Sequence, residues 1–189
     1  MSGANASTLT VTGTTVSMNN NRYRCQLSNA TCATPVNSGA AILTVRQLPS
    51  VGLTAAPLTS LLPGQTTTLT ATPNASTGGT VSTAWTYNTN PLAVTGNTFV
   101  VNVEKTGNYQ VGISESWPGG LVCANASPVV TINAPASSRL FIFPSPNDGR
   151  FSVSYYNAGG NNTQRQIMIY DAKGAAVYSR KFSIAGPYT

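Results

Sequence analysis

Apolar and polar residues alternate along much of the chain with the two-residue period of half-buried strands. The alternation is clearest over Thr66–Thr72 and Gly107–Ile113. Turn signals rich in Gly, Pro and Asn separate such runs at roughly 8–12 residues, the spacing of a β-sandwich. The predicted strands of residues 49–134 are Gly52–Ala55, Thr66–Thr72, Val81–Tyr87, Leu92–Thr95, Phe99–Val103, Gly107–Ile113 and Ser127–Ile132. We expect Trp85 to be buried in this sandwich close to Leu69 and Val111.

Residues 1–48 show the strand pattern of only the last three strands of such a sandwich. Strands are predicted at Ser7–Val11, at Tyr23–Leu27 and from Ser38 to Val45. Three strands are too few to close a sandwich core. We therefore interpret residues 1–48 as the last strands of an incomplete domain, in a chain that represents a fragment. The alternatives are that they form an extra layer on the next domain, or that they complete a neighbouring molecule.

The pattern changes after a linker of small residues at 135–138. Residues 139–189 begin with an apolar strand, a Pro-rich turn containing Asn147-Asp148-Gly149, and a second strand from Phe151 to Tyr156. A hairpin follows, with its turn predicted at Asp171–Gly174. The chain is thus predicted to contain an incomplete module, a complete module, a linker and a further small β-region.

Composition supports an all-β protein and removes most catalytic chemistry. Charged residues make up 7% of the chain, against about 25% in typical proteins, and hydrophobic residues make up 41%. There is no histidine, and Asp and Glu together number four. Neither a Ser-His-Asp triad nor a histidine metal site can be built from this chain. We therefore expect no enzyme activity, no cofactor and no metal; Asn147-Asp148-Gly149 lacks the further carboxylates of a calcium loop.

The formal net charge of +6 reflects scarce acids, because Lys and Arg together number only ten. The longest basic run is the dipeptide Arg180-Lys181, so we expect no specific nucleic-acid partner. The apolar runs are far shorter than the ~18 residues of a membrane-spanning helix, and no transmembrane segment is predicted.

The cysteines are Cys25, Cys32 and Cys123. A disulfide between Cys25 and Cys32 would close a short loop and stabilise by about 2 kcal/mol. The rival partner for Cys25 is a cysteine on a strand outside this chain. Cys123 has no partner within its own predicted domain, and is either buried and inert or paired across chains.

Two strings resemble the strand corner of immunoglobulin-like domains. They are Tyr23-Arg24-Cys25 and Tyr109-Gln110-Val111, the second with Val in the usual cysteine position. Trp85 matches the buried Trp of the third strand in that family, and Leu69 stands where the second-strand cysteine would be. The resemblance implies tandem immunoglobulin-like β-sandwich modules, as on large secreted bacterial surface proteins. It also implies that the Tyr hydroxyl bonds to backbone near the corner.

Residues 139–189 resemble the type A C-terminal sorting domain of the bacterial type IX secretion system. The similarity covers Phe143–Phe151 and Ile167–Gly174. It departs at Ser145, where the family has Asn, and the family's final strands are missing. The residues carrying the motif are Pro144, Pro146, Asn147, Gly149, Tyr170, Asp171 and Gly174.

These features together predict a non-catalytic protein, structural or adhesive, that is extracellular or on the surface of a Gram-negative bacterium. The resemblance implies the type IX translocon as a partner through the sorting domain. Few charges and abundant Thr and Asn suit hydrogen bonding to glycans or to copies of the protein itself. Two alternatives remain: a filament subunit that uses strand complementation, and the non-catalytic tail of a secreted hydrolase.

Overall fold

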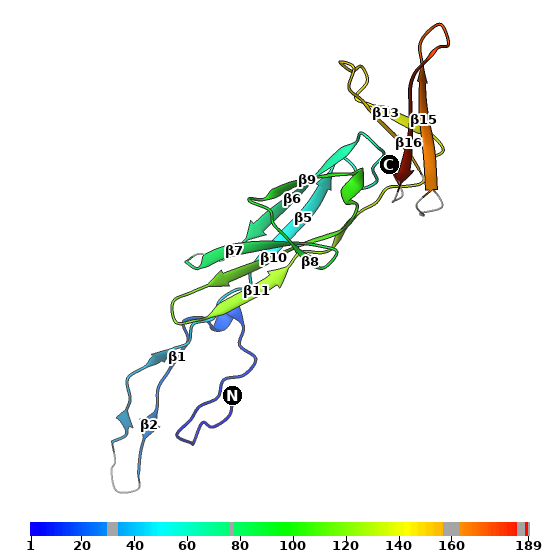
Figure 1. Ribbon diagram of the computed structural model, residues 1–189. Coiled ribbons are helices and arrows are strands. Elements are labelled where there is room, and N and C mark those ends of the chain that lie inside the picture. The colour runs from blue at the N-terminus through cyan, green and yellow to red at the C-terminus, as the bar shows by residue number, and fades with distance from the viewer. Residues whose placement is uncertain (30–33, 76–77, 157–162, 185–187, 189) are drawn as a thin grey trace. The chain divides into compact units, whose positions relative to one another are not determined.

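The computed structural model describes residues 1–29, 34–75, 78–156, 163–184 and 188 (Figure 1). Within these residues the regular elements are strands in antiparallel ladders and two short 3-10 helices, so the predicted all-β fold class is confirmed. The chain divides into two compact units. One consists of Met1–Pro49, Asn74–Val81 and Ser114–Ala124, and the other of Ser50–Pro73, Ser82–Ile113 and Asn125–Thr189.

The elements follow one another in short steps along the chain. They are η1 (Val16–Met18), β1 (Arg22–Tyr23), β2 (Gln26–Leu27), β3 (Val36–Asn37), β4 (Ala41–Ile42), β5 (Ser50–Ala56), β6 (Thr66–Asn74), β7 (Thr80–Tyr87), β8 (Asn90–Leu92), β9 (Thr98–Asn102), η2 (Val103–Lys105), β10 (Gly107–Ser116), β11 (Val122–Ala126), β12 (Val130–Ile132), β13 (Leu140–Phe143), β14 (Ser152–Tyr155), β15 (Thr163–Tyr170) and β16 (Ala176–Ile184).

Strands β5 to β12 build two sheets (Figure 1). One has the order β5-β6-β9. The other has the order β11-β10-β7-β8, with β12 also paired to β10. Consecutive strands β6 and β7 belong to different sheets, as do β8 and β9. The chain therefore crosses repeatedly between two layers and buries one face of each, which is the sandwich that the alternation predicts.

The alternation that marks the strands in the sequence also fixes which side chains are buried. In β6 the side chains of Thr67, Leu69 and Ala71 are buried, while their neighbours along the strand face outward. In β10 the buried side chains include Tyr109, Val111 and Ile113. Because a strand directs successive side chains to opposite faces, one residue of register shift would expose each of these sets.

Aromatic rings join the two layers. The ring of Trp85 in β7 lies 6.4 Å from that of Phe99 in β9, and Phe99 stands directly opposite Leu69 in the β6–β9 ladder. Trp85 is only 3% exposed, and both Leu69 and Val111 are fully buried. The predicted burial of Trp85 is therefore confirmed, with Phe99 as its ring partner from the opposite sheet.

Tyr109 anchors the turn before β10. Its hydroxyl donates a hydrogen bond to the carbonyl of Lys105, at the end of η2. Its ring lies 5.0 Å from the ring of Tyr87, whose own hydroxyl donates to the carbonyl of Thr106 at 2.7 Å. Burial, and secondarily the nearby Tyr87, raise the pKa of Tyr109 to about 12. The expected bond from a corner tyrosine to nearby backbone is thus present at Tyr109.

Several predicted strands differ in the structure. The predicted strand Tyr23–Leu27 is divided into β1 and β2, the one from Ser38 to Val45 is reduced to β4, and the one at Leu92–Thr95 is replaced by β8, which ends at Leu92. Ser7–Val11 is not a strand; within it Thr10 alone forms a bridge, to Ser2. The predicted closing strand at Ser127–Ile132 is shortened to β12, and β11 before it was not among the predicted strands. Ser127 interrupts the ladder because its side-chain oxygen accepts the amide of Val111 at 3.0 Å, and Pro128 after it has no amide to donate.

The described part of residues 1–49 contains two small ladders, β1 with β4 and β2 with β3, each of two residue pairs. Many of their apolar side chains remain exposed, including Leu27 at 73% and Val36 at 69%. This exposure agrees with the expectation that the strands of residues 1–48 are too few to close a hydrophobic core.

Replacing Trp85 by Ala should lower the free energy of unfolding by about 3–5 kcal/mol, because it leaves a cavity between the sheets. Chemical denaturation measures the change. Val100→Ala is the matched control, since Val100 lies on β9 and is 59% exposed. The control should change stability by less than about 0.5 kcal/mol. Equal stability of the two variants would contradict the position given to Trp85.

Replacing Tyr109 by Phe should cost about 1 kcal/mol by removing the bond to the Lys105 carbonyl. A second effect concerns pH. The pKa of Tyr109 is raised from 10.0 to about 12 in the fold. The folded state thus holds this proton more tightly than the unfolded state, and the associated stability is present below pH 10 and lost as the pH rises toward 12.

Unfolding free energies measured across that alkaline range should therefore fall more steeply for the parent than for Tyr109→Phe. Tyr178→Phe, which alters a 41% exposed tyrosine, should retain the parent's slope. Parallel slopes for the parent and Tyr109→Phe would contradict the raised pKa.

Candidate functional site

The first part of the predicted sorting motif lies between β13 and β14. These strands pair from Leu140↔Tyr155 to Phe143↔Ser152, so residues 144–151 form the connection. The side chain of Asn147 holds this connection: its Oδ1 accepts the amide of Gly149 at 3.0 Å and its Nδ2 donates to the carbonyl of Pro144 at 3.5 Å. Gly149 has a φ of +97°, which favours glycine.

The second part of the motif forms the turn of the β15–β16 hairpin. The Oδ1 atom of Asp171 accepts the amides of Lys173 at 2.8 Å and Ala175 at 2.9 Å. The backbone closes the same turn, because the amide of Gly174 donates to the Asp171 carbonyl at 3.0 Å. Gly174 has a φ of +84°. The hairpin turn predicted at Asp171–Gly174 is therefore present, with an aspartate cap and a left-handed glycine.

The motif residues are thus divided between two turns. Pro144, Pro146, Asn147 and Gly149 belong to the first, and Asp171 and Gly174 belong to the second, with Tyr170 ending β15 before it. Tyr170 is 55% exposed and its hydroxyl contacts the sulfur of Met168 at 3.5 Å. Both turns are exposed to solvent, at residues 144–149 and 171–174.

The carboxylates of this region act on the backbone. Asp171 caps its turn, and Oδ1 of Asp148 accepts the amide of Arg150 at 3.3 Å. Across the described residues there is no group of three His, Cys, Asp or Glu side chains that could hold a metal ion.

The predicted Cys25–Cys32 disulfide stays a prediction, because Cys32 lies outside the described residues. Cys25 is exposed, and its backbone pairs with Ser38: the Cys25 amide donates to the Ser38 Oγ at 2.9 Å, and the Ser38 amide donates to the Cys25 carbonyl at 2.9 Å. Cys123 is half-buried in β11.

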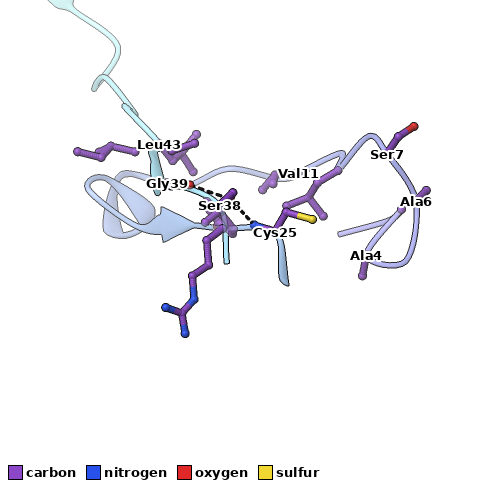
Figure 2. A pocket seen from close by; sticks show the side chains of 14 residues that line it. Ala4, Ala6, Ser7, Val11, Cys25, Ser38, Gly39 and Leu43 are labelled. Atoms are coloured by element: carbon purple, nitrogen blue, oxygen red, sulfur yellow. Dashed lines mark hydrogen bonds between the residues drawn. The ribbon is translucent and has the colours of Figure 1, made fainter. Parts of the chain in front are cut away.

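A cavity of about 440 Å³ lies beside Cys25 and Ser38 within residues 3–43 (Figure 2). Its walls are mostly apolar, and include Val11, Tyr23 and Leu43. The lining of this cavity and the exposed side chains of Leu27 in β2 and Val36 in β3 are apolar surface that is accessible to solvent.

Sequence reasoning missed a buried cluster at the β10–β11 turn. Glu115 is fully buried and Trp117 is 8% exposed, and the guanidinium carbon of Arg46 lies 5.4 Å from the Trp117 ring centroid. A Cβ on Gly79 would come within 2.5 Å of Glu115 Cγ and 2.8 Å of Trp117 Cε2, so only glycine fits there. The sequence signal was weak, since Gly78-Gly79 and Trp117 lie far apart along the chain.

No protein-family model matches the chain, and no curated protein matches it. None of the helical segments among the described residues has the length and apolar character needed to cross a membrane.

Replacing Asp171 by Ala should loosen the β15–β16 turn, because the amides of Lys173 and Ala175 both lose their acceptor. We expect hydrogen exchange at these two amides to accelerate about tenfold or more. Asp148→Ala is the matched control, since it removes a carboxylate from the other turn. Protection at Lys173 and Ala175 that survives in Asp171→Ala would contradict the capping role.

Proposed function

We propose that this chain is part of a non-catalytic, secreted cell-surface protein with a structural or adhesive role, exported by the type IX secretion system. Residues 139–189 would address the protein to the translocon, and the β-modules before them would extend from the cell. The observation that carries the export proposal is the pair of turns at 144–149 and 171–174, in which each residue of the sorting motif occupies a defined turn or strand-end position.

The turn geometry supports this assignment because it explains why the motif needs its particular residues. Asn147 and Asp171 each supply an oxygen to backbone amides of their own turn. Gly149 and Gly174 each adopt a positive φ that other residues rarely adopt. A receptor that reads the shape of two tight turns would lose its target if either cap or either glycine were replaced.

The structural role is supported by the middle module. Its layers, of orders β5-β6-β9 and β11-β10-β7-β8, together with the Tyr109 bond at the corner before β10, match what the immunoglobulin-like resemblance implies. Such modules are rigid spacers with loops and strand edges free for contacts. The scarcity of charge leaves hydroxyl and amide groups to make those contacts.

The export proposal is tested in cells with a working type IX system. The chain fused to a signal peptide should reach the cell surface, as scored by protease accessibility on intact cells. A strain lacking the translocon should retain it in the periplasm. Periplasmic retention in the competent strain would contradict the proposal.

Within the same assay, Gly174→Val should reduce surface display several-fold, because a β-branched residue opposes a φ of +84°. Gly13→Val is the matched control, since Gly13 also has a positive φ, of +65°, but lies outside the sorting region. Equal display of the two variants would indicate that the second turn is not read.

A filament subunit remains the second candidate function, and the exposed apolar residues of the first unit favour it. Leu27, Val36 and Ile42 are all more than half exposed, on ladders of only two residue pairs. Strand addition from another copy would extend these ladders and cover the side chains. Light scattering at micromolar concentration should then show a ladder of oligomers, whereas a monomer at all concentrations would exclude this candidate.

A further inference from the structure

The β15–β16 hairpin carries two arginines on one face. The strands pair in the order Arg165↔Phe182, Ile167↔Arg180 and Ile169↔Tyr178. Residues directly opposite one another, and every second residue along a strand, share a face. One face of the hairpin therefore displays the side chains of Arg165, Arg180, Phe182, Tyr178, Ile167 and Ile169.

Aromatic rings hold both guanidinium groups. The guanidinium carbon of Arg180 lies 5.3 Å from the ring centroid of Phe182, and that of Arg165 lies 5.7 Å from the ring centroid of Tyr155. Both arginines are exposed. Stacking on a ring restricts a guanidinium while leaving its N–H donors free to face a ligand.

The two arginines are also diagonal neighbours. Arg180 stands two positions before Phe182, the residue opposite Arg165, so the two side chains start roughly 7–8 Å apart on the same face. That separation lets both planar forks reach one oxyanion group, each with a charge-assisted hydrogen bond.

The same rings line a cavity. Tyr155, Tyr178 and Phe182 contribute to the walls of a space of about 940 Å³, which is large enough for an oligosaccharide segment. Arg150 and Glu104 also line it and offset each other in charge. Arg165 and Arg180 do not line this space themselves, but each lies over a ring that does, Tyr155 and Phe182 respectively. Their positive charges next to the cavity favour an anionic ligand.

We propose that this face of β15–β16 binds a uronic acid-bearing polysaccharide, with Arg165 and Arg180 gripping a carboxylate and the exposed ring of Tyr178 packing against the sugar. The aromatic wall favours a carboxylated sugar over a bare inorganic anion, because an inorganic anion would use the arginines alone. The inference is independent of the export proposal, since it depends only on the contacts of the folded hairpin and its neighbour β14.

The test is titration of the 189-residue chain with uronate oligomers prepared from alginate, followed by isothermal calorimetry. The parent should bind these oligomers and should not bind neutral dextran oligomers of the same length. The double variant Arg165→Gln/Arg180→Gln should bind at least tenfold more weakly. Tyr178→Ala should weaken binding several-fold with the charge unchanged.

The matched control is Arg139→Gln/Lys173→Gln, which removes the same charge from exposed positions of the same region. It should bind within about twofold of the parent. Far-ultraviolet circular dichroism of each variant confirms that the strands are retained. Absence of binding by the parent, equal binding of dextran, or an equal loss in the control and the arginine double variant would each overturn the proposal.

Replacement by lysine separates the guanidinium fork from charge alone. Arg165→Lys/Arg180→Lys keeps both positive charges but loses the planar, two-donor geometry. We expect this variant to lie between the parent and the glutamine double variant. Affinity equal to the parent would show that charge alone is recognised and would overturn the paired-fork geometry.

Discussion

The contact between aromatic rings of opposite sheets holds the middle module together. Trp85 from one sheet meets Phe99 from the other, and Phe99 in turn lies 6.0 Å from Tyr109. Each ring buries a large apolar area, and their tilted geometries suit aromatic packing. Because Tyr109 also bonds the Lys105 carbonyl, the same cluster fixes the path of the chain as it passes from β9 into β10.

The two hairpins of residues 139–189 are stabilised by hydrogen bonds in their turns, whereas the middle module is stabilised by aromatic packing. Their turns are stabilised by polar side chains that satisfy backbone amides, at Asn147 and at Asp171. The few acids of the region are thereby committed to local structure, while its arginines remain exposed. This division gives the region well-defined turns and an uncompensated positive charge at once. The export proposal depends on the turns, and the polysaccharide proposal depends on the charge.

In the first unit, strands β1 to β4 form only two-stranded sheets among the described residues. Its ladders contain two residue pairs each, and large apolar side chains such as Leu27 and Val36 stay in contact with water. The buried cluster of Glu115 and Trp117 in the same unit is, by contrast, so tightly packed that Gly79 has no room for a side chain. Packing within this unit is therefore uneven.

The sequence by itself determined the all-β class, the burial of Trp85 and the two turns of the C-terminal region. These follow from local rules: alternation sets the buried face of β6 and β10, and Asn147, Gly149, Asp171 and Gly174 specify tight turns through short-range bonds and positive φ. The breaks in the predicted strands were not determined in this way. Ser127 ends a ladder because it bonds Val111 on another strand, and Ser7–Val11 has strand-like residues but pairs only at Thr10.

Only the tertiary structure decided which distant residues meet. Arg165 and Arg180 share a face because the hairpin register places them there, and the Tyr155 ring reaches Arg165 from a different hairpin. Arg46 and Gly79 approach Trp117 across long stretches of chain. Local propensity carries no information about such contacts, since they arise from the pairing and layering of strands that are far apart in sequence.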